Sequence, residues 1–512
     1  MRKLLEAAAA AAFVLAGSRA EAAASYLLHD MAMDYSEGYG ISAAPLVAGT
    51  DGNFYGVAAE GVFTATTQAG GTVFKMTPTG TLTVLHVLDE APVNGPYINA
   101  EGVFPCGLVR AGDGAFYGSA IRGGANGSGT VFRVTEEGVF TVLYTFSASA
   151  SDGTNVGGIW PETILVGADG ALYGTTASGG TSGKGTFFKL TFDGNLTTLY
   201  NFSNDYSPLQ NLLIAGDDGN FYGASGNTYG GFGNTVFKLT ATGGYSVVHQ
   251  LAASEGQFVT AMTAGRDGYL YVATVIDGGF SQVGVSLGSV LRLTTSGNVT
   301  VLHQFAPEVY RYDWSGCWGD NPCKWLPYPL GINADGGSVE TLLQAAGGTL
   351  YGSMTNLGPD GGGGIFSLTQ DGVFTLLNSN GGLAPYSSAG TLTDAGDGGY
   401  ILTVESRSGL YPESIVKLVP NAPLSVHAAF TPSTVRLFGT AKLSWSSTGA
   451  SSCTITGDYA DSMKDVTATS GSRSVRVWSI QRRKPATFFA VVNCKSADGL
   501  GVANAVAPLA VQ

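Results

Sequence analysis

Short segments in which apolar and polar residues alternate recur along most of the chain. Residues 71–77 read Gly-Thr-Val-Phe-Lys-Met-Thr, and residues 129–135 read Gly-Thr-Val-Phe-Arg-Val-Thr. Related segments cover residues 185–191, 234–240, 288–294, 363–369 and 413–419. A period of two residues is that of a β-strand with one buried face. The pattern therefore predicts one such strand in each of several repeats.

A second recurring segment joins a turn to an aromatic strand. It reads Asp-Gly-Asn-Phe-Tyr-Gly at residues 51–56, and related copies begin at residues 113, 169, 218, 267, 347 and 397. Asp favours turns because its side chain accepts local hydrogen bonds, and Gly because it adopts positive φ. The copies start 62, 56, 49, 49, 80 and 50 residues apart. The spacing predicts seven repeats, with an insertion after the fifth.

Each repeat predicts four strands. An apolar run such as residues 212–215 precedes the turn, and a segment such as residues 83–88 follows the alternating strand. Units of four strands and about 40–50 residues are typical of β-propeller blades. The seventh repeat lacks its fourth strand before Pro420, and residues 26–31 carry that pattern at the other end. We therefore predict an all-β fold with a seven-bladed β-propeller over residues 25–420, closed by an N-terminal strand. A β-solenoid is the alternative, but it needs no such displaced strand.

These repeats closely resemble the GloVer-type "choice-of-anchor" tandem-repeat family of exported bacterial proteins. The resemblance covers about residues 25–420. It rests on the turn at residues 51–56, the Thr-Val-Phe-Lys-Leu-Thr strand at residues 235–240 and the Val-Leu-His strand at residues 84–86. It implies β-propeller-like repeats and variable anchoring, and it implies no particular reaction.

The segment from residue 421 to residue 512 is predicted to be a second domain, because Pro420 and Pro423 mark a linker. Residues 442–453 and 488–494 read as core strands. They resemble a bacterial immunoglobulin-like β-sandwich, with Trp445 packed near a bridge between Cys453 and Cys494. The Trp precedes both cysteines, so the order differs from that of antibody domains. Such domains usually act as spacers or adhesive modules, which is an analogy at the level of fold.

Composition excludes several classes of protein. Gly accounts for 76 of 512 residues, and only 12% of residues are charged. Long helices are therefore disfavoured, since Gly costs about 1 kcal/mol relative to Ala inside a helix. The net charge is −13. Without clustered Lys and Arg, an acidic chain is a poor binder of nucleic acid.

The N-terminus predicts export. Residues 1–24 combine a basic start, an apolar stretch and small residues at 20–24, which is the pattern of a signal peptide. The remaining chain has no apolar run long enough to span a bilayer, so we expect a periplasmic, extracellular or cell-surface protein. Five cysteines suit an oxidising compartment. We predict the disulfides Cys317–Cys323 and Cys453–Cys494, which leave Cys106 over, although sequence alone does not determine connectivity.

The recurring polar residues are predicted to be structural. His29, His86, His249 and His303 occupy equivalent positions in the fourth strand of different repeats. In a propeller this strand is outermost, so these side chains cannot converge on one metal or substrate. The Asp-Gly turns lack the closely spaced oxygen ligands of a calcium loop, although ion binding there stays open. The Tyr that follows each turn is expected in the core. We predict no cofactor and no metal.

We place the candidate site in the loops that differ from the repeat, because loops on a rigid scaffold commonly carry function. The insertion at about 306–340 contains three of the six Trp residues. Large aromatic side chains and nearby carboxylates suit stacking on sugar rings and bonding to hydroxyl groups. Alternatively, the insertion folds onto itself and plugs the central channel. The predicted ligand-binding residues are Tyr310, Tyr312, Asp313, Trp314, Trp318, Asp320, Trp325, Tyr328 and, on the same expected face as Tyr97, Trp160.

Together these features predict a non-catalytic binding or scaffold protein that recognises an extracellular or envelope glycan or protein through propeller loops. One alternative is a polysaccharide lyase or glycoside hydrolase, for which Glu308, Asp313, Asp320 and Glu340 offer carboxylates without singling out a pair. Another is a structural or adhesion module that acts through the C-terminal domain. The sequence determines neither the ligand nor the oligomeric state.

Overall fold

The structure is a computed structural model in which all regular elements of the described residues, apart from one isolated turn residue, are β-strands. No helix in the described part of the chain is long and apolar enough to cross a membrane. The described residues are 24–31, 36–37, 40–41, 45–61, 67–68, 70–92, 97–150, 154–203, 207–208, 212–226, 235–275, 288–305, 309–310, 331–332, 337–356, 364–379, 387–406, 413–419, 425–436, 439–457, 468–476, 486–495 and 501–511.

Successive stretches of chain form antiparallel sheets of four strands, in which the order across the sheet follows the order along the chain. The first two sheets comprise β2 (Val47–Ala48), β3 (Phe54–Ala58), β5 (Thr72–Met76) and β6 (Leu82–Val87), then β8 (Val103–Arg110), β9 (Phe116–Arg122), β10 (Thr130–Val134) and β11 (Phe140–Thr145). The next comprises β12 (Asn155–Val166), β13 (Leu172–Gly180), β14 (Thr186–Leu190) and β15 (Leu196–Asn201).

The same arrangement continues in the following sheets. In one of them the first position is divided between β16 (Ser207–Pro208) and β17 (Ile214–Ala215), followed by β18 (Phe221–Gly226), β19 (Thr235–Leu239) and β20 (Tyr245–Gln250). Two more comprise β21 (Phe258–Ala264), β22 (Tyr269–Val275), β23 (Ser289–Thr294) and β24 (Val299–Gln304), then β27 (Gly337–Gln344), β28 (Leu350–Asn356), β29 (Gly364–Leu368) and β30 (Phe374–Ser379). Two-residue ribbons pair β4 (Thr67–Gln68) with β7 (Ala91–Pro92) and β25 (Val309–Tyr310) with β26 (Gly331–Ile332).

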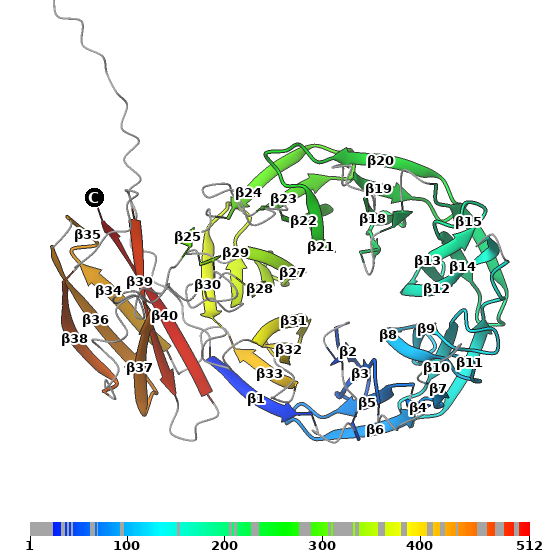
Figure 1. The fold of residues 1–512 in the computed structure, drawn as a ribbon, viewed down its shortest axis with the longest axis horizontal. Coiled ribbons are helices and arrows are strands. Elements are labelled where there is room, and N and C mark those ends of the chain that lie inside the picture. Colours follow the sequence, from blue (N-terminus) through cyan, green and yellow to red (C-terminus); the bar gives the residue numbers. More distant parts are fainter. Residues whose placement is uncertain are drawn as a thin grey trace, which may run out of the picture.

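The sheets lie in a ring, with the first strand of each nearest the centre and the fourth at the outer rim (Figure 1). Neighbouring sheets bury aromatic residues between their faces. Tyr55 stacks on Phe116 of the next sheet, with ring centroids 4.2 Å apart, and Tyr173 packs on Phe221 with centroids 4.5 Å apart. These tyrosines are at most 1% exposed. The prediction that they belong to the core is confirmed.

The N-terminal strand completes the last sheet of the ring. β1 (Ala24–Asp30) pairs with β33 (Ser414–Val419), which follows β31 (Ser387–Asp394) and β32 (Tyr400–Ser406). The strand thus takes the place left empty before Pro420, as its sequence predicts. It begins one residue before the expected mature start, since Ala24 lies opposite Val419.

The described residues between 425 and 511 form two layers of strands around a separate core, and one layer continues the last sheet of the ring. One sheet contains β34 (Ser425–Thr431), β36 (Thr440–Thr448) and β38 (Ser470–Arg476), and the other contains β37 (Ser452–Gly457), β39 (Ala486–Lys495) and β40 (Gly501–Val511), with β35 (Thr434–Val435) parallel to β40. Cys453 and Cys494 face each other across β37 and β39 and form the predicted disulfide. Trp445 belongs to the same core, and its Nε1 donates to Ala468 O at 3.1 Å.

The two parts of the chain share one sheet. The second edge of β1 pairs with β40, with Ser25 opposite Val502 and Tyr26 opposite Gly501. Tyr26 also packs against the core of residues 426–509. β1 therefore has a partner on each edge, which removes an exposed edge strand from the ring.

Candidate functional site: an arginine held between aromatic rings

Most of the predicted ligand-binding residues lie outside the described residues. Tyr312, Asp313, Trp314, Trp318, Asp320, Trp325 and Tyr328 all do, and so does the predicted Cys317–Cys323 pair. Two short parts of the insertion, residues 309–310 and 331–332, are described, and they pair as β25 and β26, with Tyr310 opposite Gly331. Trp160 is the predicted site residue whose side chain is described.

Trp160 occupies an unusual backbone position. Its φ is +59°, in the left-handed region, although it is not glycine. Ile159 and Pro161, which flank it, stay in register with Ser178 and Thr176, and the register between β12 and β13 shifts on either side of this stretch. Phe104, at the equivalent place in β8, has φ of +60°, and the register of β8 shifts after it, between Cys106 and Leu108. A bulky residue in this region is strained, and such strain clusters at functional sites.

Each of these positive-φ residues is fixed by a bond to the preceding sheet. Trp160 N donates to Ser128 O at 2.9 Å, and Phe104 N donates to Gly70 O at 2.9 Å. A proline follows each residue, Pro161 in β12 and Pro105 in β8. The proline has no N–H to donate to the strand ladder. The bonds to Ser128 O and Gly70 O therefore hold the strained backbone from the neighbouring sheet.

Arg122 connects the regions of the two positive-φ residues. It is the last residue of β9, and its guanidinium carbon lies 4.9 Å from the centre of the Trp160 ring and 5.8 Å from that of Tyr97. Tyr97 in turn meets Phe104 edge to face, with centroids 5.4 Å apart. We call Tyr97, Phe104, Arg122 and Trp160 the Arg122 cluster. The structure thus brings together two aromatic residues, Tyr97 and Trp160, that the sequence places only on the same face.

Arg122 differs from those cations of the alternating strands that pair with the Asp of the adjacent turn. Lys189 bonds Asp169 at 2.6 Å, and Arg133 lies 3.4 Å from Asp113. Arg122 is exposed, and none of the described carboxylates pairs with it. Among the described residues, its charge faces the rings of Tyr97 and Trp160, and aromatic faces attract cations through their quadrupoles.

Sequence reasoning overlooked Arg122, although the repeats carry a signal for it. Counting from the aromatic strand, the equivalent residue is Glu60 in the preceding repeat and Ser178 in the following one. Arg122 therefore departs from the repeat in charge, as the insertion at 306–340 departs from it in length. A comparison of charges position by position would have singled it out.

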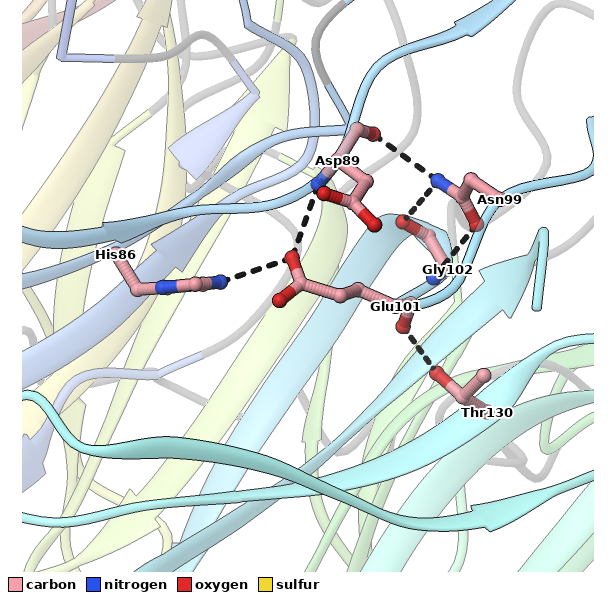
Figure 2. Close-up of polar contacts among 6 residues, drawn as sticks. All are labelled: His86, Asp89, Asn99, Glu101, Gly102 and Thr130. Atoms are coloured by element: carbon pink, nitrogen blue, oxygen red, sulfur yellow. Dashed lines mark hydrogen bonds and ion pairs between the residues drawn. The ribbon is translucent and has the colours of Figure 1, made fainter.

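A hydrogen-bond network fixes the loop that carries Tyr97 (Figure 2). His86 Nε2 lies 2.9 Å from Glu101 Oε2, and the same oxygen accepts a bond from Asp89 N at 3.0 Å. Asn99 Nδ2 donates to Asp89 O at 3.0 Å and to Gly102 O at 3.1 Å. Thr130 Oγ1 donates to Glu101 O at 2.6 Å. The loop is thus bonded to the outer strand β6 and to β10.

The same network reaches the hairpin that carries Arg122. Asn99 Oδ1 accepts bonds from Gly102 N at 2.8 Å and from Gly124 N at 3.0 Å. Gly123 has φ of +80°, and a Cβ there would lie 2.8 Å from Asn99 Oδ1. Glycine is therefore required where the hairpin approaches the loop. Tyr97 and Arg122 are held in place by one amide side chain.

The other rim histidines make comparable local pairs. His29 lies 2.9 Å from Glu37, and His249 lies 2.8 Å from Glu255. His303 stacks on Phe374 of the next sheet, with centroids 4.2 Å apart. The described residues contain no group of three or more His, Cys, Asp or Glu placed to hold a metal ion. The histidines join strands and loops, as their separate positions predict.

The Asp-Gly turns bind their own tyrosines. Tyr222 OH donates to Asp218 Oδ2 at 2.7 Å, and Asn220 N donates to Asp218 Oδ1 at 3.1 Å. Burial and the hydrogen bond to Asp218 raise the pKa of Tyr222 above its ordinary value. The hydrogen bond from Lys189 to Asp169 lowers the pKa of that carboxyl group. The carboxylates of these turns therefore stabilise the fold through hydrogen bonds to their own turn and the adjoining strands.

A cavity of about 690 Å³ lies among the first strands of the sheets. Its lining includes Leu108, Ile164, Met262 and Leu342 together with threonines, and no Lys, Arg or His is among the described lining residues. Two carboxylates line it, Glu162 from β12 and Glu340 from β27. These strands lie on opposite sides of the ring (Figure 1). The cavity thus offers acidic groups, whereas the Arg122 cluster offers a cation.

Comparison with known proteins supports the repeats. A family model described as the Gloeobacter/Verrucomicrobia repeat matches residues 105–321. The chain is a repeat protein. The match contains Arg122 and Trp160 and thus covers part of the cluster. No curated protein sequence matches the chain.

Solved structures match most of the chain at low identity. A putative oxidoreductase (glucose dehydrogenase) from Thermus thermophilus is 14% identical, with a TM-score of 0.39 over 77% of this chain and 99% of that one. A puromycin hydrolase is 11% identical, with a TM-score of 0.47 over 82% of this chain and 61% of that one. An exo-β-1,3-galactanase from Phanerochaete chrysosporium is 10% identical, with a TM-score of 0.33 over 77% and 95%.

Proposed function

We propose that this protein is an exported, non-catalytic binding protein that recognises an extracellular or envelope glycan through loops on one face of its ring. The Arg122 cluster carries the proposal. It combines two strained aromatic positions, Phe104 and Trp160, with a fixed cation at the surface. Aromatic rings stack on the apolar faces of sugars, and a guanidinium donates hydrogen bonds to their oxygens.

The scaffold in this proposal is a seven-bladed β-propeller followed by an immunoglobulin-like domain. Repeated four-stranded antiparallel sheets and the completion of the last sheet by β1 support the propeller. Two sheets around a core with Trp445 and the Cys453–Cys494 disulfide support the second domain. The disulfide is compatible with an oxidising compartment. Variable anchoring, as in "choice-of-anchor" proteins, belongs to the same proposal.

Rigidity is what suits such a scaffold to recognition. Residues of the cluster come from the loop before β8, from β8 and β9 and from the first part of β12, and bonds between sheets hold them. A preorganised site loses little conformational entropy on binding. The insertion at 306–340 is proposed to add aromatic side chains to this face.

A screen of neutral and charged polysaccharides with residues 25–512 tests the proposal. We expect saturable binding without release of reducing ends. Trp160→Ala should weaken it about tenfold, because removing a stacked aromatic side chain costs about 1–3 kcal/mol. Val301→Ala, at a 48% exposed site on the outer strand β24, is the matched control. Binding that Trp160→Ala leaves unchanged would remove the cluster from the ligand site.

The cavity favours a second candidate, a polysaccharide lyase or glycoside hydrolase. Glycoside hydrolases commonly use a pair of carboxylates, and Glu162 and Glu340 line one cavity. Product release from a polysaccharide that Glu340→Gln abolishes would replace the binding proposal by this one. Intact polysaccharide after prolonged incubation would exclude it for that substrate.

A further inference from the structure

We propose that the Arg122 cluster selects saccharides that carry a carboxylate or sulfate group. The proposal deepens the proposed function and rests on it. Its starting point is that a saccharide-binding face needs no cation to hold a neutral sugar, whereas this face carries one. The guanidinium of Arg122 lies over the rings of Trp160 and Tyr97 and is exposed to solvent.

The charge of the chain makes this cation unusual. The protein has 25 basic and 38 acidic residues, so an anionic polymer approaches against a net charge of −13. The cations on the alternating strands at Arg133, Lys189 and Lys417 are each engaged by the Asp of the adjacent turn. Among the described carboxylates none engages Arg122, so its charge is available to a ligand.

No hydrogen bond with a described residue occupies the donors of Arg122. The guanidinium group lies over the faces of the Trp160 and Tyr97 rings, a contact that is not a hydrogen bond. Five N–H groups lie in the guanidinium plane, and their fork matches the paired oxygens of a carboxylate or sulfate. Aromatic contact also restricts the side chain before binding, which reduces the entropy lost when the bonds form.

The surroundings offer the sugar an apolar surface beside the anion site. Ile98 follows Tyr97 directly and is 54% exposed. Trp160 and Tyr97 are each half-buried, so part of each ring is accessible. An anionic sugar has both an apolar ring face and a charged substituent, and the cluster has a counterpart for each. A free inorganic anion would use only Arg122.

Matched polysaccharides test the selection. Polygalacturonate is compared with its fully methyl-esterified form, and a sulfated galactan with its desulfated form, both at low salt. We expect the anionic member of at least one pair to bind about tenfold or more tightly, because hydrogen bonds between charged groups are worth about 1.5–3 kcal/mol. The pair that shows the difference identifies carboxylate or sulfate as the ligand group. Raising the salt should reduce that difference.

Variants distinguish a specific contact of Arg122 with the ligand from a general effect of net charge on binding. Arg122→Gln should lower the affinity for the anionic member about tenfold and leave the neutral member unchanged, because it removes the charged donors. Arg122→Lys should give an intermediate affinity, because an ammonium group lacks the planar fork. Arg266→Gln is the matched control. Arg266 is also exposed, but it lies in the turn before the second strand of its sheet, whereas Arg122 lies at the end of the second strand of its own sheet.

The outcomes distinguish this proposal from the function on which it rests. Equal binding of charged and neutral members, or an equal loss with Arg122→Gln and Arg266→Gln, overturns the anion selection and leaves glycan binding standing. Binding of sodium sulfate or sodium acetate alone as tightly as the polymer overturns the saccharide part. A chain that binds no polysaccharide overturns both proposals.

Discussion

His86 Nε2 lies 2.9 Å from Glu101 Oε2, and this pair joins the outer strand β6 to the loop that presents Tyr97. A rim histidine thus contributes to the candidate site without touching a ligand. The pair positions the loop, since Glu101 also accepts a bond from Asp89 N and its carbonyl accepts one from Thr130.

Glu101→Ala is expected to weaken saccharide binding by loosening the Tyr97 loop. It removes the bonds to His86 and Asp89 N, at a cost to folding of about 1–3 kcal/mol. The matched control is Glu255→Ala, which removes the equivalent bonds to His249 and Ala252 N. Urea unfolding should show similar losses for both variants, and a binding assay should show a loss for Glu101→Ala alone. Equal binding by the two variants would contradict a positioning role.

Tyr222→Phe is expected to lower the free energy of unfolding by about 1 kcal/mol. Tyr222 is fully buried, and its hydroxyl group donates to Asp218 at 2.7 Å. The ring stays in the variant, so packing is kept. Tyr222→Ala should cost about 3–5 kcal/mol, because it also leaves a cavity. Urea titration of the three proteins checks the order; a Tyr222→Phe variant as unstable as Tyr222→Ala would show that the hydroxyl group dominates.

Acid should remove the contribution of Asp169 to stability. The bond from Lys189 lowers the pKa of Asp169 below its ordinary value of 3.8. A carboxyl group with a lowered folded-state pKa stabilises the fold above its unfolded pKa, and this stabilisation is lost as the pH falls through the folded-state pKa. Wild type should therefore exceed Asp169→Asn in stability at neutral pH, with the difference vanishing well below pH 3.8. A difference that grows toward acid would contradict this sign.

Removing the Cys453–Cys494 disulfide should destabilise the C-terminal sheets by about 2–4 kcal/mol. The bridge spans a sequence separation of 41 residues and lies in the core with Trp445. Cys453→Ala combined with Cys494→Ala should lower the thermal midpoint monitored by Trp fluorescence. A reducing agent should lower the midpoint of the wild type and leave that of the double variant unchanged. A wild type insensitive to reduction would contradict the prediction.

Local patterns predicted much of the fold because each repeat contains the alternating and turn patterns of its own strands. The alternation in residues 71–77 and the turn at residues 51–56 appear as β5 and the start of β3, with Tyr55 buried. The displaced strand pattern at residues 26–31 identified β1 and its pairing with β33. The pairing of β1 with β40 was not predictable, because a two-residue ladder leaves no periodic signal.

The candidate site was only partly accessible from sequence. The sequence predicts Trp160 as a site residue because it is an aromatic residue outside the repeat pattern. Neither its left-handed φ nor its contact with Arg122 follows from the adjacent residues in the sequence. The ligand role of the insertion at 306–340 stays a prediction, since residues 311–330 lie outside those described.

By itself the sequence determined the all-β repeats, the strand that completes the last sheet and the structural roles of the Asp-Gly turns, because these depend on local hydrogen bonds and on which face of a strand is apolar. Only the tertiary structure decided that Tyr97, Arg122 and Trp160 meet. Arg122 ends β9, Trp160 lies in β12 of the next sheet and Tyr97 lies in the loop before β8, so the distances between them are set by how the sheets and this loop pack.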